Sequence, residues 1–209
     1  MSEPVVIPLN LSPDKLVQLQ QLQHVFADVC NTLAPLAREH VCWNRVALHH
    51  LAYHTLRKQY PQLGSQMVCN AIYSVSRVCR ILFQNPTSPF NLNQSQRESL
   101  PLLRFAPTAP VYFDRHTLSI KEGMVSMLTL DGRIRFLLSI SQADEARFKT
   151  EKLREIILSS CASQYQLSFL FANINEKKSD TTQNALPEYV AVLPEEAATE
   201  PRALIGEAA

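Results

Sequence analysis

Two groups of side chains in this sequence have residue types that chemistry uses: a histidine-rich segment and a set of arginines with polar neighbours. The segment HHLAYH holds His49, His50 and His54, and the last two are one helical turn apart, which suits a shared metal ion. Two ligands are too few for a zinc site, Cys42 lies off their face, and no acidic residue is close in sequence. We therefore predict no metal and no cofactor, and interpret these histidines as surface or half-buried residues.

The arginines suit a different chemistry, because guanidinium groups bind phosphate and stack on bases. Residues 38–104 contain eight Lys or Arg and two acidic residues, a net charge of +6. Such an excess attracts polyanions when it lies on one face, although solvated helices also carry it. On this helical segment the sequence predicts nucleic-acid contacts by Arg45, Arg57, Lys58, Gln66, Asn70, Tyr73, Arg77 and Arg80.

A second cationic group is expected on a β-hairpin over residues 124–140. Apolar residues alternate there with Arg133 and Arg135, which predicts a strand with one apolar and one cationic face. Lys121 is close in sequence. The same charge pattern also serves solubility, but we predict that these three cations extend the nucleic-acid surface.

An enzymatic alternative rests on one short motif. Arg45 and His50 have the R-x4-6-H spacing of the HEPN ribonucleases, in which a helix end presents both residues to a scissile phosphate. Val46 stands where that family usually has a polar residue, and a substantial β region is foreign to its all-helical fold. A metal-independent ribonuclease therefore remains the alternative to a non-catalytic binding protein.

A mixed chain must position these residues. A short strand is expected over residues 5–9, and Ser12-Pro13-Asp14 begins a helix whose apolar residues recur to about Leu33. Further helices are predicted over residues 41–60, where Pro61 ends the pattern, and 65–84. Residues 85–100 form a polar connection.

From about Leu102 the pattern turns to strands, near residues 111–113, 117–121 and 165–171, with Asp131-Gly132 as the expected two-residue turn of the hairpin. Residues 144–158 have helical spacing. Residues 179–209 contain one basic and six acidic residues, a net charge of −5, and predict a disordered acidic tail.

The cysteines and the apolar runs bear on the compartment. Five cysteines, an odd number without a CxxC pair, favour a reducing environment, and Cys30, Cys69 and Cys79 are interpreted as packed small hydrophobes. No apolar run approaches the roughly 18 residues that a membrane span requires. We expect a cytoplasmic protein with no membrane contact.

Four stretches resemble, in consistent order, the N-terminal half of the insertion-sequence-encoded TnpB (OrfB) proteins, the transposon relatives of CRISPR-associated nucleases. PLNLSPDKLVQLQQLQHVFADVCNTL is similar to the family's opening, and LRKQYPQLGSQMVCNAIYSVSRVCR to its next helical pair. SIKEGMVSMLTLDGRIRFLLSI resembles the hairpin of its wedge domain, and QYQLSFLFANINEK the strand before its nuclease domain. The resemblance covers roughly residues 4–178.

The resemblance implies an α+β fold in which a helical recognition domain is inserted into an OB-like wedge β-barrel. The wedge would comprise residues 1–11 and 101–178, the helical domain with its polar linker residues 12–100, and the acidic tail residues 179–209. The family's RuvC-type nuclease domain should open with Asp in an Asp-x-Gly context. Asp180 lacks that glycine, and no residues remain for the other carboxylates, so the resemblance implies binding without cleavage.

Several functions follow as expectations. The first is non-catalytic binding of structured RNA or an RNA–DNA duplex, chiefly through phosphates. The second is a scaffold subunit whose apolar faces dock a separately encoded nuclease or a second copy of the chain. The third is a transposon remnant without a selected activity.

Overall fold

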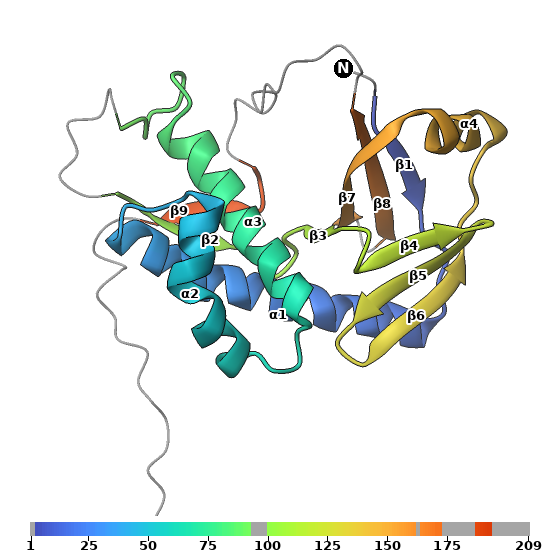
Figure 1. The fold of residues 1–209 in the computed structure, drawn as a ribbon, viewed down its shortest axis with the longest axis horizontal. Coiled ribbons are helices and arrows are strands. Elements are labelled where there is room, and N and C mark those ends of the chain that lie inside the picture. The colour runs from blue at the N-terminus through green and yellow to red at the C-terminus, as the bar shows by residue number, and fades with distance from the viewer. Residues whose placement is uncertain (1–2, 93–99, 162–163, 173–186, 194–209) are drawn as a thin grey trace, which may run out of the picture.

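The computed structural model describes residues 3–92, 100–161, 164–172 and 187–193, and within them the chain is an α+β protein (Figure 1). Its helices are α1 (Pro13–Glu39), α2 (Arg45–Gln59), α3 (Ser65–Phe83) and α4 (Gln142–Thr150). Its strands are β1 (Val5–Pro8), β2 (Leu102–Phe105), β3 (Val111–Phe113), β4 (Leu118–Lys121), β5 (Met124–Thr129), β6 (Gly132–Leu137), β7 (Lys152–Cys161), β8 (Gln164–Ala172) and β9 (Val190–Leu193).

The strands form three antiparallel sheets rather than one closed barrel. The largest has the order β1-β8-β7-β3, the second pairs β2 with β9, and the third is the meander β4-β5-β6. The helices α1, α2 and α3 lie in sequence between β1 and β2. This combination of helices and antiparallel sheets confirms the predicted α+β class, but the strands do not close into the predicted barrel.

None of the described helices is long and apolar enough to cross a membrane.

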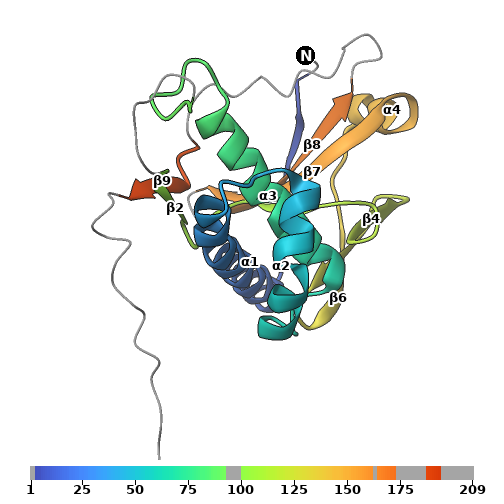
Figure 2. The same cartoon turned by 60° about the vertical axis from the view of Figure 1, so that its left-hand side comes forward.

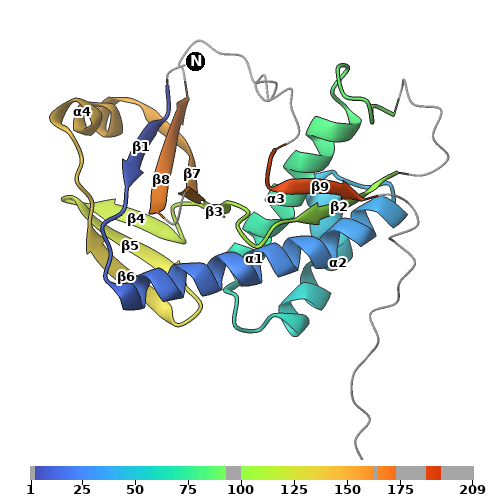
Figure 3. The same cartoon turned by 180° about the vertical axis from the view of Figure 1, so that it is seen from behind.

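Helix α1 joins the two ends of the molecule (Figure 3). Near its start, the Lys15 ammonium donates to the Arg135 carbonyl of β6 at 2.8 Å. Near its other end, the Asn31 side chain makes two bonds to the backbone of Phe105 in β2, at 3.0 and 2.7 Å. The helix continues through Pro35 to Glu39, beyond its predicted end near Leu33, because the apolar face stays buried as far as Ala37.

Gln23 is the buried polar centre of this packing. Its side-chain nitrogen donates to the carbonyls of Thr108 and Ala109 at 2.8 and 3.0 Å, and its oxygen accepts from the Tyr165 hydroxyl at 3.1 Å. Only 2% of Gln23 is exposed, so water does not replace these partners. One residue of α1 thereby fixes the approach to β3 and the start of β8.

The predicted helix over residues 144–158 is wrong in its second half. Helix α4 ends at Thr150, and residues 152–161 form β7, which pairs with both β3 and β8. Ile156 and Leu158 are buried while their neighbours are less so, which is the period of two of a strand. Pairing on both sides overrides the weak helical spacing.

The hairpin predicted over residues 124–140 is confirmed as β5–β6, but its two-residue turn lies at residues 130–131, one residue earlier than predicted, and a type I′ turn occurs in the hairpin before it. Lys121 pairs with Met124, so Glu122 and Gly123 form a two-residue turn, and both have positive φ (51° and 76°), as a type I′ turn requires. In the β5–β6 hairpin Thr129 pairs with Gly132, whose φ is 105°. Asp131 is not in the left-handed region, so the predicted Asp131-Gly132 turn is wrong.

The predicted tail over residues 179–209 is only partly described, and what is described is not disordered. Strand β9 pairs with β2 along four residues, and Val190 is buried. The Tyr189 carbonyl also accepts from Ala106 N at 2.8 Å. Residues 179–186 and 194–209 lie outside the described ranges.

The Gln23 contacts make a stability prediction. Changing Gln23→Ala removes a buried amide and its hydrogen bonds to the Thr108 and Ala109 carbonyls and to the Tyr165 hydroxyl. We therefore expect the free energy of unfolding to fall by about 1–3 kcal/mol. Urea denaturation measures the change. Gln20→Ala, an exposed position on the same helix, is the matched control and should change stability by less than about 0.5 kcal/mol. Equal effects would contradict the described packing.

Candidate nucleic-acid interface

The polar face of α3, which the sequence assigned to nucleic acid, is turned toward the sheet. Asn70 is 5% exposed and its amide nitrogen donates to the Tyr112 carbonyl in β3 at 3.0 Å. Gln66 donates to the Asp114 carboxylate at 2.6 Å. These two side chains satisfy polar groups of the chain itself, so their presence on a helix face has an intramolecular explanation.

Tyr73 and Arg77 continue the same contact. The Tyr73 hydroxyl donates to Glu155 Oε1 of β7 at 2.5 Å, and Arg77 Nη1 donates to the Tyr112 hydroxyl at 2.9 Å. Burial raises the pKa of Tyr73, and the neighbouring Glu155 carboxylate raises it further, so the phenol stays neutral and remains a donor. Both side chains hold α3 against β3 and β7.

The other helical candidates differ in accessibility. Arg57 donates to the backbone carbonyl of Leu63, and its guanidinium therefore ties the end of α2 to the following turn. Arg80 is half-buried and engaged with other groups of the chain. Lys58 is exposed in the last turn of α2.

The hairpin cations, in contrast, lie together on one exposed sheet face. We call the outward-pointing side of β4-β5-β6 the outer face; its opposite side packs into the core through residues such as Val125 and Met127. Leu137 on the outer face is 73% exposed. In cross-strand rows, the outer face consists of Ser119, Ser126 and Arg135, then Lys121, Met124 and Leu137, then Leu128 and Arg133. It contains three cations and no acidic residue.

Two further basic residues, which sequence reasoning missed, border this face. Arg115 and His116 lie exposed in the turn between β3 and β4, and Arg115 Nε approaches His116 Nε2 at 3.3 Å. Arg133 Nη2 donates to the His116 carbonyl at 2.5 Å, which places the turn beside β6. The sequence signal was the pair Arg115-His116 itself, but only the fold brings it next to Arg133.

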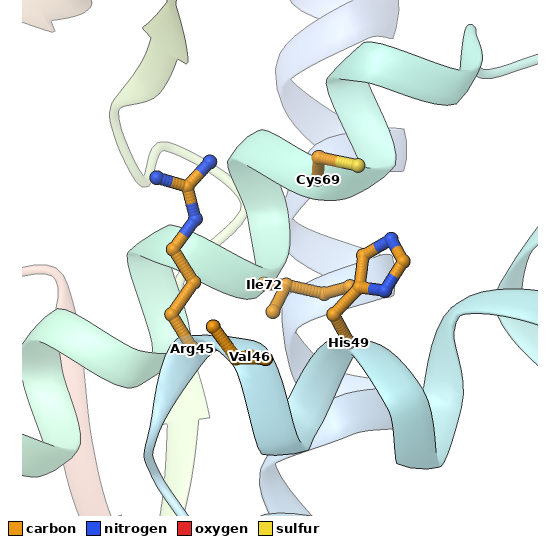
Figure 4. A pocket seen from close by; sticks show the side chains of 5 residues that line it. All are labelled: Arg45, Val46, His49, Cys69 and Ile72. Carbon is orange, nitrogen blue, oxygen red and sulfur yellow. The ribbon is translucent and has the colours of Figure 1, made fainter.

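Arg45, a further accessible cation, is exposed at the start of α2. Asn44 caps the helix by accepting from the backbone nitrogens of Val46 and Ala47, which fixes where Arg45 begins. The Arg45 guanidinium lies 5.4 Å from the centre of the Tyr73 ring, a cation–π contact. It borders a shallow, open pocket of about 330 Å³ (Figure 4), lined by Arg45, Val46, His49, Cys69 and Ile72.

One close contact joins the start of α3 to the outer face. The backbone of Gly64, just before α3, approaches the Leu128 side chain so closely that a Cβ there would lie 3.1 Å from Leu128 Cδ2. The Arg45 charge and the Asp114 charge both act on the Cys69 thiol, and Asp114 adjoins Arg115. Lys121, Arg133 and Arg135 lie on the paired strands β4 and β6 of one sheet, and Arg115 lies in the turn that Arg133 contacts.

Among the residues that the structure describes, four of these cations have no close acidic partner. Within the described ranges, no carboxylate oxygen lies within 4.0 Å of a side-chain nitrogen of Arg45, Lys121, Arg133 or Arg135. By comparison, Arg147 and Lys149 in α4 pair with Glu151 and Glu145. Carboxylates such as Asp114 and Glu155 do occur nearby, but they accept hydrogen bonds from Gln66 and Tyr73.

The histidine segment falls on α2 and offers no metal cluster. In the part of the chain that the structure describes, no three His, Cys, Asp or Glu residues are placed to hold one ion. Arg45 and His50 are five residues apart, which separates them by about 140° around the helix. His50 is exposed, and His49 lines the pocket instead. The HEPN spacing thus does not place its two residues on one face.

Comparison of the sequence with models of known protein families finds no family that matches, and comparison with curated proteins finds no significant similarity.

Thiol reactivity tests the placement of α3 and α1. Burial raises the pKa of the Cys79 thiol to about 12 and also raises the pKa of Cys30, so almost no thiolate forms at pH 8 in the folded chain. Cys69 is half-buried at the pocket. We expect N-ethylmaleimide to modify Cys69 well before Cys30 and Cys79, as peptide mass spectrometry would measure. Rapid modification of Cys79 in the native protein would contradict the described core.

Proposed function

We propose that the protein binds nucleic acid without cleaving it, and that the outer face of β4-β5-β6 is its main phosphate-contacting surface. The observation that carries the proposal is the face itself: Lys121 of β4 and Arg133 and Arg135 of β6 lie on one exposed side of the three-stranded sheet, with no acidic residue in the same rows. Arg115 and His116 border the same face.

The chemistry of the face suits a sugar–phosphate backbone. Guanidinium and ammonium groups bind phosphate oxygens, the serine hydroxyls donate hydrogen bonds, and the exposed Met124 and Leu137 contact sugars and base edges. A face of this composition recognises backbone shape more than sequence. The bound ligand is accordingly structured RNA or an RNA–DNA duplex.

The resemblance to the N-terminal half of TnpB proteins supports the same ligand. In that comparison α1–α3 correspond to the helical recognition domain inserted into the wedge, and the β-sheets to an opened form of its OB-like wedge barrel. The resemblance implies binding without cleavage, and the proposed role is therefore binding alone.

Salt-dependent binding to RNA tests the proposal. Changing Lys121, Arg133 and Arg135 together to Ala removes three cations from the outer face. We expect the affinity for a structured RNA to fall by roughly tenfold or more, and the slope of log affinity against log salt to become shallower by about three. Fluorescence anisotropy over a salt series measures both quantities.

Arg104→Ala is the matched control, because Arg104 is exposed on β2, and Figures 1 and 2 place β2 and β6 at different ends of the molecule. The control should keep the wild-type slope within about one unit. An unchanged slope in the triple variant, or equal losses in both proteins, would exclude the outer face. Cleavage of the RNA in EDTA, abolished by His50→Ala, would instead favour the ribonuclease alternative.

A further inference from the structure

The pocket between α2 and α3 is a second feature, separate from the outer face. Figure 4 shows the Arg45 guanidinium and the His49 ring standing on either side, with Cys69 above and Ile72 between them. Val46 at its rim is 65% exposed, and Ile72 is buried. No acidic side chain lines the pocket.

Both polar walls are held in place by aromatic rings. The guanidinium of Arg45 rests on Tyr73, which is itself tied to β7 by its bond to Glu155. The His49 imidazole stacks on Tyr53, with ring centres 4.5 Å apart and planes inclined by 18°. Arg45 and His49 are one helical turn apart at the N-terminus of α2, where the helix dipole favours a bound anion. The pocket therefore has a fixed cation, a fixed flat ring and an apolar floor.

These three features match the three parts of a nucleotide. A phosphate would bind the guanidinium, a base would extend the Tyr53–His49 stack, and the base edge would cover Ile72 and Val46. The volume of about 330 Å³ is at the small end of ligand pockets, which suits one nucleotide and not a longer ligand. A base inside a regular duplex is stacked on its neighbours and cannot enter.

We propose that this pocket receives a single unstacked nucleotide of the bound strand, at a bulge, loop or end. The inference rests on the proposed function, because it assumes that the chain binds nucleic acid at all. It adds that one position of the ligand is unpaired, and that Arg45, His49 and Cys69 surround it.

Two RNA hairpins, identical except for one bulged adenosine, test the inference. With the bulged hairpin we expect His49→Ala to weaken binding by roughly tenfold, since stacking on one base contributes that much. His54→Ala, an exposed histidine of α2 outside the pocket, is the matched control and should bind as the wild type does. With the fully paired hairpin, His49→Ala should have no effect.

A cysteine variant tests the pocket by filling it. Cys69→Phe fills the space and should weaken binding of the bulged hairpin, whereas binding of the fully paired hairpin, which does not enter the pocket, should be unchanged. In the wild-type protein, the bulged hairpin should slow alkylation of Cys69 several-fold, and the paired hairpin should not. Thermal melting checks that each variant is folded.

The outcomes separate the two proposals. If the protein binds neither hairpin, or binds without salt dependence, the proposed function itself is wrong. If it binds both hairpins equally, with the outer-face variant impaired but His49→Ala and Cys69→Phe unaffected, only the nucleotide pocket is wrong. Protection of Cys69 by free adenosine monophosphate but not by the bulged hairpin would identify a mononucleotide site and overturn the strand-bound version.

Discussion

The contact between the polar face of α3 and the strands β3 and β7 is the interaction on which the rest of the arrangement depends. Asn70 is buried against the Tyr112 carbonyl, and Tyr73 and Arg77 reach Glu155 and the Tyr112 hydroxyl. A buried polar group without its partner costs about 1–3 kcal/mol, so these groups specify how the helix meets the sheet. With the helices fixed to the sheet in this way, the remaining cations acquire defined positions.

That constraint divides the basic residues into two sets with different roles. Arg57 and Arg77 serve the fold, one at a helix end and one at the helix–sheet contact. The side chains of Lys121 and Arg135 make no hydrogen bond to another described residue and lie on an exposed face. Arg133 donates to Ser126 of the same sheet and to the His116 carbonyl of the neighbouring turn. The same contact also positions a wall of the pocket. The Tyr73 ring makes the cation–π contact with Arg45, and the Tyr73 hydroxyl donates to Glu155 of β7.

Much of this fold follows from local sequence rules, and the exceptions have a common cause. The strand β1, the start of α1 at Pro13 and the hairpin β5–β6 are where periodicity and capping residues predict them. Periodicity shows which face of α3 is apolar. It does not show that Asn70 on the polar face donates to the Tyr112 carbonyl of β3, 42 residues further along the chain. The same limit explains β7 and β9, which are strands because of partners distant in sequence. Arg115 likewise lies beside the outer face only because Arg133 binds the carbonyl of the neighbouring His116.

Cross-linking of bound RNA to the protein tests the central claim most directly, because it locates the ligand on the wild-type protein without any substitution. Irradiation of the complex and mass spectrometry of the attached peptides should find the links within residues 115–137, on the outer face and its bordering turn, with a second group at the start of α2. Links confined to α4 or to the β2–β9 ladder, with none in residues 115–137, would contradict the account.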